Sequence, residues 1–167
     1  MGGSVVVNSG GILNIYRDAS EAGDTWSIPS NFIVNTGGTV NLYGNTTVVN
    51  AAAAGTATNP HGAGPTISAG NITIASGASL NADVTGFGSG AGPGKGPVDS
   101  SSGCGGGGGY GGRGGGCSSG LLGGPTYGSA TAPTALGSGG GRIGFTNAGG
   151  GAVKLSVSGT LTVNGTL

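Results

Sequence analysis

Few side chains of this chain are of the types that do acid–base chemistry. Aspartate and glutamate together number five in 167 residues, and charged residues make up only 6%. Hydrolytic β-rich enzymes work with clustered carboxylates and a basic partner, whereas Asp83 and Asp99 are isolated here. Asp18, Glu21 and Asp24 are spaced three residues apart, but in a loop-like stretch that gives them no fixed geometry. We therefore expect that the protein is not an enzyme.

Motifs for nucleotides, metals and nucleic acids are equally scarce. The chain has no G-x-S-x-G motif and no phosphate-binding loop, since GPGKG lacks the required spacing. Its only histidine, His61, lies in a proline-containing stretch and is expected to be exposed and without a ligand role. The segment GYGGRGGG resembles an arginine–glycine RNA-binding box, but one Arg113 in a chain of zero net charge cannot neutralise many phosphates. The sequence predicts no cofactor, no metal and no nucleic-acid partner.

Two cysteines lie thirteen positions apart in the stretch CGGGGGYGGRGGGC. A disulfide between Cys104 and Cys117 would close a loop of about 14 residues and contribute about 3 kcal/mol on a loop-entropy model. Such a bond implies an oxidising compartment outside the cytoplasm. The alternative is a pair of free thiols. No apolar run approaches the ~20 residues that span a membrane, so membrane insertion is not expected.

Two aromatic residues, Tyr16 and Trp26, flank the one charged excursion of the chain, YRDASEAGDTWSIPS. Both rings could stack on a sugar, with Arg17, Asp18 and Asp24 binding its hydroxyl groups. The structural alternative is a solvated loop whose Trp26 covers an open end of the core, and this alternative is favoured.

The elements that must position these residues come from an internal repeat. Each copy has alternating apolar residues, a Ser/Thr-Gly corner and a second short apolar run, which predicts two short strands joined by a tight turn. One copy cannot bury its apolar face alone, so the copies must stack. The copies cover residues 5–15, 32–42, 72–82 and 155–163.

Between the third and fourth copies lies a glycine-rich stretch, from Gly86 to Gly151, that holds most of the 44 glycines. A glycine edge lets another backbone approach closely and exchange hydrogen bonds. We expect an ordered layer, either extended or of polyglycine II type, rather than a loose linker. Apolar residues that follow the cysteines, among them Leu122 and Leu136, are expected to pin this layer to the β core.

The four copies resemble the parallel β-helix repeats of bacterial surface proteins such as autotransporter passengers and filamentous haemagglutinin-like adhesins. The segments YGSATAPTALGSGGG and GGGAVKLSVSGTLTVNG are also similar to glycine-rich modules that recur in very large extracellular proteins. The resemblance implies a structural or adhesive role at the cell surface.

The sequence thus predicts an all-β chain that forms a right-handed parallel β-helix, or solenoid, with a glycine-rich layer on its side. A β-sandwich is the alternative. One domain, 1–167, would comprise β-helix turns over 1–85, a glycine-rich insertion with the cysteine pair over 86–152 and a final turn over 153–167.

The predicted function is that of a structural subunit of an extracellular filament, sheath or surface appendage. The first and last copies are uncharged and uncapped, so copies of the chain would stack head to tail through open strand edges, aided by glycine-mediated packing. The assembly strands are represented by Val5, Val6, Val7, Leu155, Val157, Leu161 and Val163. One alternative is a glycan-binding adhesin module cut from a larger surface protein, which would use Tyr16 and Trp26. A lesser alternative is an ice-binding protein.

Overall fold

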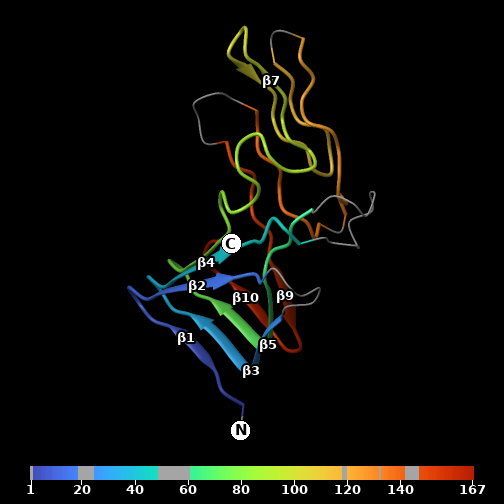
Figure 1. The fold of residues 1–167 in the computed structure, drawn as a ribbon. Coiled ribbons are helices and arrows are strands. Elements are labelled where there is room, and N and C mark those ends of the chain that lie inside the picture. The colour runs from blue at the N-terminus through green and yellow to red at the C-terminus, as the bar shows by residue number, and fades with distance from the viewer. Residues whose placement is uncertain (1, 19–24, 49–60, 118–119, 132, 142–146) are drawn as a thin grey trace.

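The computed structural model describes residues 2–18, 25–48, 61–117, 120–131, 133–141 and 147–167. These residues form ten strands and no helix (Figure 1). The strands are β1 (Val5–Val7), β2 (Ile12–Tyr16), β3 (Thr25–Val34), β4 (Thr39–Tyr43), β5 (Thr66–Ile74), β6 (Ser79–Asn81), β7 (Val98–Asp99), β8 (Cys104–Gly105), β9 (Lys154–Val157) and β10 (Leu161–Val163).

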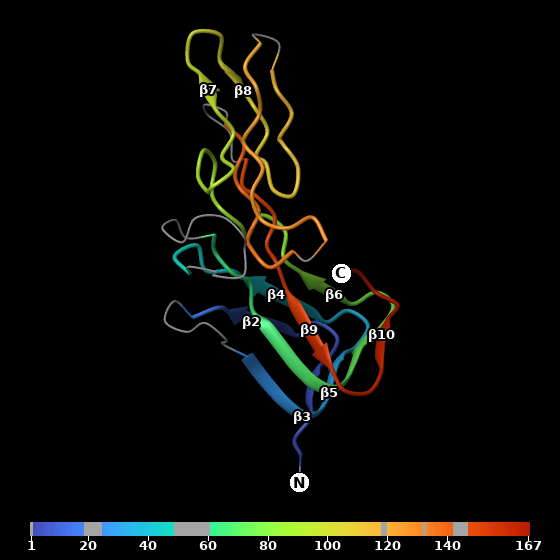
Figure 2. The same cartoon turned by 90° about the vertical axis from the view of Figure 1, so that its right-hand side faces the viewer.

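The strands belong to three separate sheets. A five-stranded sheet has the order β1-β3-β5-β10, and β9 also pairs with β5, in line with β10. A three-stranded sheet has the order β2-β4-β6, and all pairings in these two sheets are parallel. The third sheet is the small antiparallel hairpin β7–β8. Figure 2 shows the two parallel sheets at one end of the molecule and the glycine-rich segments extending away from them.

Each repeat copy contributes strands in matching register. Val5 lies opposite Phe32, Phe32 opposite Ile72, and Ile72 opposite Leu161. The corner between the paired strands of a copy contains a glycine of positive φ: Gly10 at 75°, Gly37 at 79° and Gly77 at 74°. Side chains other than glycine rarely adopt this conformation, so the repeated glycine sets the turn and with it the register.

Alternate residues of both parallel sheets share one hydrophobic core. The side chains of this core that have no exposed surface are Phe32, Val34, Val40, Leu42, Ile67, Ile72 and Ile74. Outside the core, asparagine side chains bond across neighbouring strands: Asn41 donates to Asn14 at 3.0 Å and Asn71 to Asn31 at 2.9 Å. The period-two pattern of the sequence therefore places apolar residues inside and amides outside.

The predicted parallel β-helix is wrong. The sheets have two to five strands, one of them is antiparallel, and none is closed or solenoid-like in the described part of the chain. The copies are unevenly spaced, and the last one adds strands only to the five-stranded sheet, beside β5. A continuous solenoid requires each copy to add a strand to both sheets, and the last copy does not. The sandwich alternative does not fit either, because that fold pairs antiparallel sheets and both larger sheets are parallel.

The glycine-rich segments form a bundle joined by backbone hydrogen bonds. Gly106 donates to Pro97 at 2.9 Å and accepts from Gly141 at 2.9 Å. The next residue, Gly107, donates to Gly115 at 2.8 Å and accepts from Gly124 at 2.9 Å. A strand in a flat sheet has two neighbours, whereas this segment has four. Only chains without side chains can approach one another from so many directions.

Candidate functional site

Among the residues considered for chemistry, Asp99 has the most defined surroundings. Its carboxylate accepts bonds from the hydroxyl groups of Ser101 at 2.6 Å and Ser102 at 2.7 Å, and from the Ser101 amide at 3.0 Å. These bonds lower the pKa of Asp99 from 3.8 to about 2, the Ser101 hydroxyl having the largest effect. Because Ser101 and Ser102 lie in the same turn as Asp99, we interpret Asp99 as a residue that stabilises this turn.

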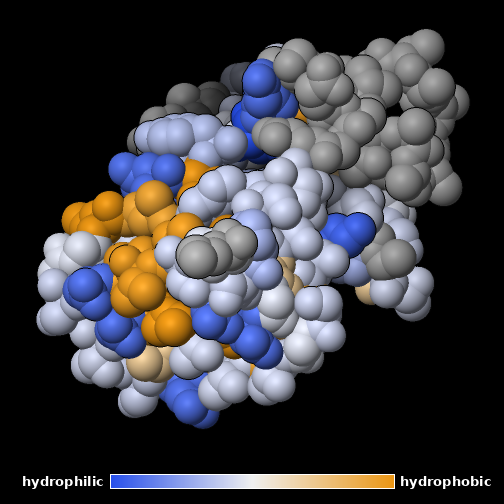
Figure 3. Space-filling model, turned by 90° about the horizontal axis from the view of Figure 1, so that it is seen from below, coloured by the Kyte–Doolittle hydropathy of each residue, from blue (hydrophilic) through white to orange (hydrophobic). Residues whose placement is uncertain are grey.

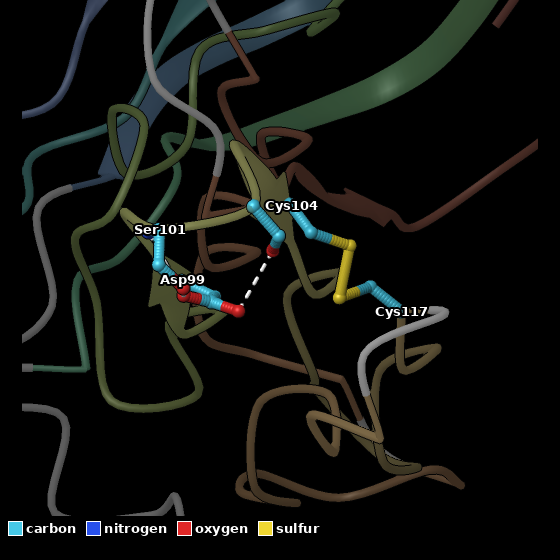
Figure 4. The surroundings of a disulfide bond; sticks show 5 residues. Asp99, Ser101, Cys104 and Cys117 are labelled. Carbon is cyan, nitrogen blue, oxygen red and sulfur yellow. Dashed lines mark hydrogen bonds between the residues drawn. A yellow bond between two sulfur atoms is a disulfide. The ribbon is translucent and has the colours of Figure 1, made fainter.

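The predicted disulfide between Cys104 and Cys117 is present, next to this turn (Figure 4). Its Cα atoms are 6.2 Å apart, within the usual range. Cys104 lies in β8, directly opposite Asp99 of β7. The disulfide and the Asp99 turn therefore hold the same hairpin at the end of the glycine-rich bundle.

His61 differs from the expectation of an exposed side chain. It is only 6% exposed, its ring stacks on Tyr127 with centroids 6.0 Å apart, and its carbonyl accepts a bond from the Leu136 amide. Its Nδ1 has no hydrogen-bond partner among the described residues. His61 thus belongs to the junction between the β core and the glycine-rich bundle. Two further acidic candidates, Glu21 and Asp24, lie outside the described residues.

The two aromatic candidates line one pocket of about 380 Å³. Tyr16 is the last residue of β2 and Trp26 the second residue of β3, so residues from both parallel sheets meet there. Arg17 and Asp18 are not among the described lining residues, and Arg17 is buried. The lining residues within the described part of the chain are Leu13, Asn14, Ile15, Tyr16, Thr25, Trp26, Pro65 and Thr66.

The two rings are held differently. Tyr16 stacks on Tyr43 of β4 with centroids 4.6 Å apart and planes at 10°, yet it is 66% exposed. Trp26 packs edge-on against the core residue Phe32 at 5.6 Å. Trp26 therefore covers part of the core, as the structural interpretation expected, and also lines the pocket.

The sequence analysis missed Asn14 and Thr66 as pocket residues. Asn14 precedes Tyr16 by two positions and shares its face of β2. Thr66 lies opposite Thr25 in the β3–β5 register. The third repeat copy starts at residue 72, six residues after Thr66, so the repeat pattern does not include this threonine. Extending the strand pattern back to the residue after Pro65 would have found the relation.

The strands proposed for assembly lie at the two edges of the five-stranded sheet. β1 forms one edge, and β9 and β10 form the other. Three of their side chains are apolar and markedly exposed: Val6, Leu161 and Val163. Figure 3, seen from below, shows hydrophobic side chains gathered on the left, where β1 and β2 lie in Figure 1.

The described residues include no group of three or more His, Cys, Asp or Glu side chains that could hold a metal ion. They also include no helix with the length and apolar character needed to cross a membrane. No protein-family model, curated protein or solved structure matches this chain.

Proposed function

We propose that the protein is a structural subunit of an extracellular filament, sheath or surface appendage, and that copies associate by adding strands to each other's sheet edges. The observation that carries this proposal is the exposure of the apolar side chains of β10. Leu161 and Val163 are 47% and 40% exposed, although the residues beside them in register, Ile72 and Ile74, have no exposed surface. β10 thus presents core-type side chains at an edge.

The opposite edge is suited to cover them. β1 has the same register position as β10, because Val5 and Leu161 align through Phe32 and Ile72. All the strands of this sheet run in parallel, so β1 of one copy can extend the sheet beyond β10 of another without reversing direction. Such a contact joins two different surfaces and leaves both outer edges open, which propagates into a filament.

The composition of these edges supports association. Soluble proteins commonly protect an edge strand with a charged residue, a proline or a bulge. β1 is Val-Val-Val and β10 is Leu-Thr-Val, with none of these features. The one charge at either edge is Lys154, at the start of β9. We therefore assign the contact to β10 rather than to β9.

The disulfide and the glycine-rich bundle favour an extracellular setting. Disulfides persist in oxidising compartments, and the Cys104–Cys117 bond fixes a bundle that extends away from the sheets (Figure 2). The bundle would project from the side of a filament, since it leaves β1 and β10 uncovered. Backbone hydrogen bonds hold the bundle together, so its stability does not depend on charged side chains.

The test is electron microscopy and light scattering of the non-reduced protein. Thr162→Lys on β10 and Val6→Lys on β1 each place a charge at one end of the contact. We expect filaments from the parent chain and monomers from both variants, with unchanged circular dichroism. Leu122→Lys is the matched control, because Leu122 is exposed and lies in the bundle away from both edges. Filaments of normal length from both edge variants, or a monomeric parent at all concentrations, would contradict the proposal.

A further inference from the structure

We propose that the pocket between Tyr16 and Trp26 binds an uncharged sugar unit of a glycan. This site goes beyond the association of copies and does not depend on it. The pocket has aromatic surface, orienting polar groups and no charged side chain among its described lining residues.

The pocket exists because the two sides of the five-stranded sheet are unequally covered. On one side, β9 and β10 lie in line along β5. On the other side, β1 pairs only with Phe32–Val34 at the end of β3. No described strand lies beyond Thr25–Ile28, the start of β3. The pocket lies against Thr25 and Trp26, within this uncovered part.

The aromatic wall suits the C–H face of a pyranose ring. Tyr43 supports Tyr16 from one side, so the tyrosine ring is fixed in orientation while most of its surface stays open. Trp26 is fixed in turn by its edge-on contact with Phe32. Both rings are therefore held before a ligand arrives, which reduces the entropy lost on binding. Leu13 and Pro65 extend the apolar surface between them.

Polar groups are positioned beside this wall. Asn14 accepts a bond from Asn41 through its Oδ1, so its Nδ2 can donate elsewhere. The backbone of β2 adds further groups. The backbone groups of Gly11 and Arg17 bond to β4, because the Thr39 amide donates to the Gly11 carbonyl and the Arg17 amide donates to the Tyr43 carbonyl. Because alternate residues of a parallel strand bond the same neighbour, the N–H and C=O groups of Asn14 and Tyr16 point away from β4. They face the side on which the described residues place no strand.

These groups match the alternating donors and acceptors of sugar hydroxyls, and the hydroxyl of Thr66 adds another. The described lining residues include no lysine, arginine, aspartate or glutamate, so they offer no charged partner to the carboxylate of a sialic or uronic acid. A volume of about 380 Å³ lies near the lower end of the range for small-molecule sites, roughly 300–1,000 Å³. The pocket therefore suits one sugar ring of a longer chain.

Trp26 is the only tryptophan of the protein, so its fluorescence reports directly on this pocket. The Thr162→Lys variant is used for the titration, because its substitution lies at the opposite edge and suppresses association. The probes are neutral oligosaccharides of glucose, galactose and mannose, with an oligogalacturonate as the charged comparison. We expect a saturable change in tryptophan emission with at least one neutral probe.

Tyr16→Ala and Asn14→Ala should each weaken this binding by tenfold or more. Asn8→Ala is the matched control, since Asn8 accepts an amide bond from Asn35 in the same manner but is not a lining residue. Asn8→Ala should leave the affinity unchanged. Three outcomes would overturn the proposal: no emission change at millimolar neutral sugar, preferential binding of the oligogalacturonate, or a change that follows protein concentration instead of sugar. None of them bears on filament formation, which is scored on the parent chain.

Discussion

Leu161 and Ile72 lie opposite each other in register on neighbouring strands, yet Ile72 has no exposed surface and Leu161 is 47% exposed. The two residues have the same position in the repeat and similar apolar volume. They differ only in what lies beyond them: β3 pairs with the far side of β5, and no described strand pairs with the far side of β10. Burial of Ile72 stabilises the fold of one molecule. Burial of Leu161 against a second copy would stabilise association in the same way.

Alanine substitutions at these two positions should separate folding from association. Ile72→Ala leaves a cavity in the core and should lower the free energy of unfolding by about 2–5 kcal/mol. Leu161→Ala removes a half-exposed side chain and should cost about 1 kcal/mol or less in the isolated molecule, while raising the concentration at which filaments form. Denaturant unfolding of monomeric Thr162→Lys backgrounds gives the first quantity, and light scattering of the parent background gives the second. Equal losses of stability from the two substitutions would mean that Leu161 is already covered within the molecule.

The individual strands could be predicted from this sequence, but the way in which they group into sheets could not. The short apolar runs Val5–Val7 and Phe32–Val34, each followed by a glycine corner, are a local signal of a strand, and both runs lie in strands. How the copies group into sheets depends on contacts across 27 to 89 residues, which a local pattern does not contain. The same pattern therefore allowed a continuous β-helix, whereas the structure has separate open sheets.

The candidate site shows a similar division. Tyr16 and Trp26 were found from residue type, but their meeting in one pocket depends on a β3 that extends beyond β1. For the glycine-rich stretch, Leu136 is fully buried as expected, whereas Leu122 is 66% exposed. Both are leucines within glycine-rich sequence, so composition does not distinguish them. Leu136 is buried because its side chain packs against Gly44 and Gly62, in the space that a side chain at either glycine would occupy.

Two adjacent glycines provide a matched test of the bundle. An added Cβ at Gly114 would overlap the carbonyl oxygen of Gly107, whereas one at Gly115 would meet nothing within 4 Å. Gly114→Ala should therefore destabilise the bundle by about 1–3 kcal/mol, because the backbone must shift to accommodate the added Cβ. Gly115→Ala should be neutral or stabilise by about 0.4–1 kcal/mol through the lower entropy of the unfolded chain. Amide hydrogen exchange of residues 104–124 measures both effects. Equal protection in the two variants would show that the bundle is loosely packed.

Opening the disulfide should loosen the hairpin more than the β core. The bond closes a loop of thirteen sequence positions, for which the loop-entropy model gives about 3 kcal/mol. The core cluster contains neither cysteine. A Cys104→Ser/Cys117→Ser double variant should lose amide protection around β7 and β8 and retain it in β3 and β5. Alkylation with mass spectrometry of the native parent provides the control, since two modified thiols would mean that the bond is not formed.

Acid should release the Asp99 turn in a defined window. The pKa of Asp99 is about 2 in the folded chain, against 3.8 as the ordinary value, because the ionised carboxylate accepts bonds from Ser101 and Ser102. A group with a lowered pKa stabilises the folded state above its unfolded pKa, and this stabilisation is lost as pH falls toward the folded value. The contribution of this turn should therefore be complete above about pH 5 and decline between about pH 4 and pH 2. Carboxyl ¹³C chemical shifts measure the titration directly. Ser101→Ala should move the Asp99 pKa back toward 3.8, because it removes the bond with the largest effect. An unchanged midpoint in this variant would contradict the assignment of the shift to the Ser101 hydroxyl.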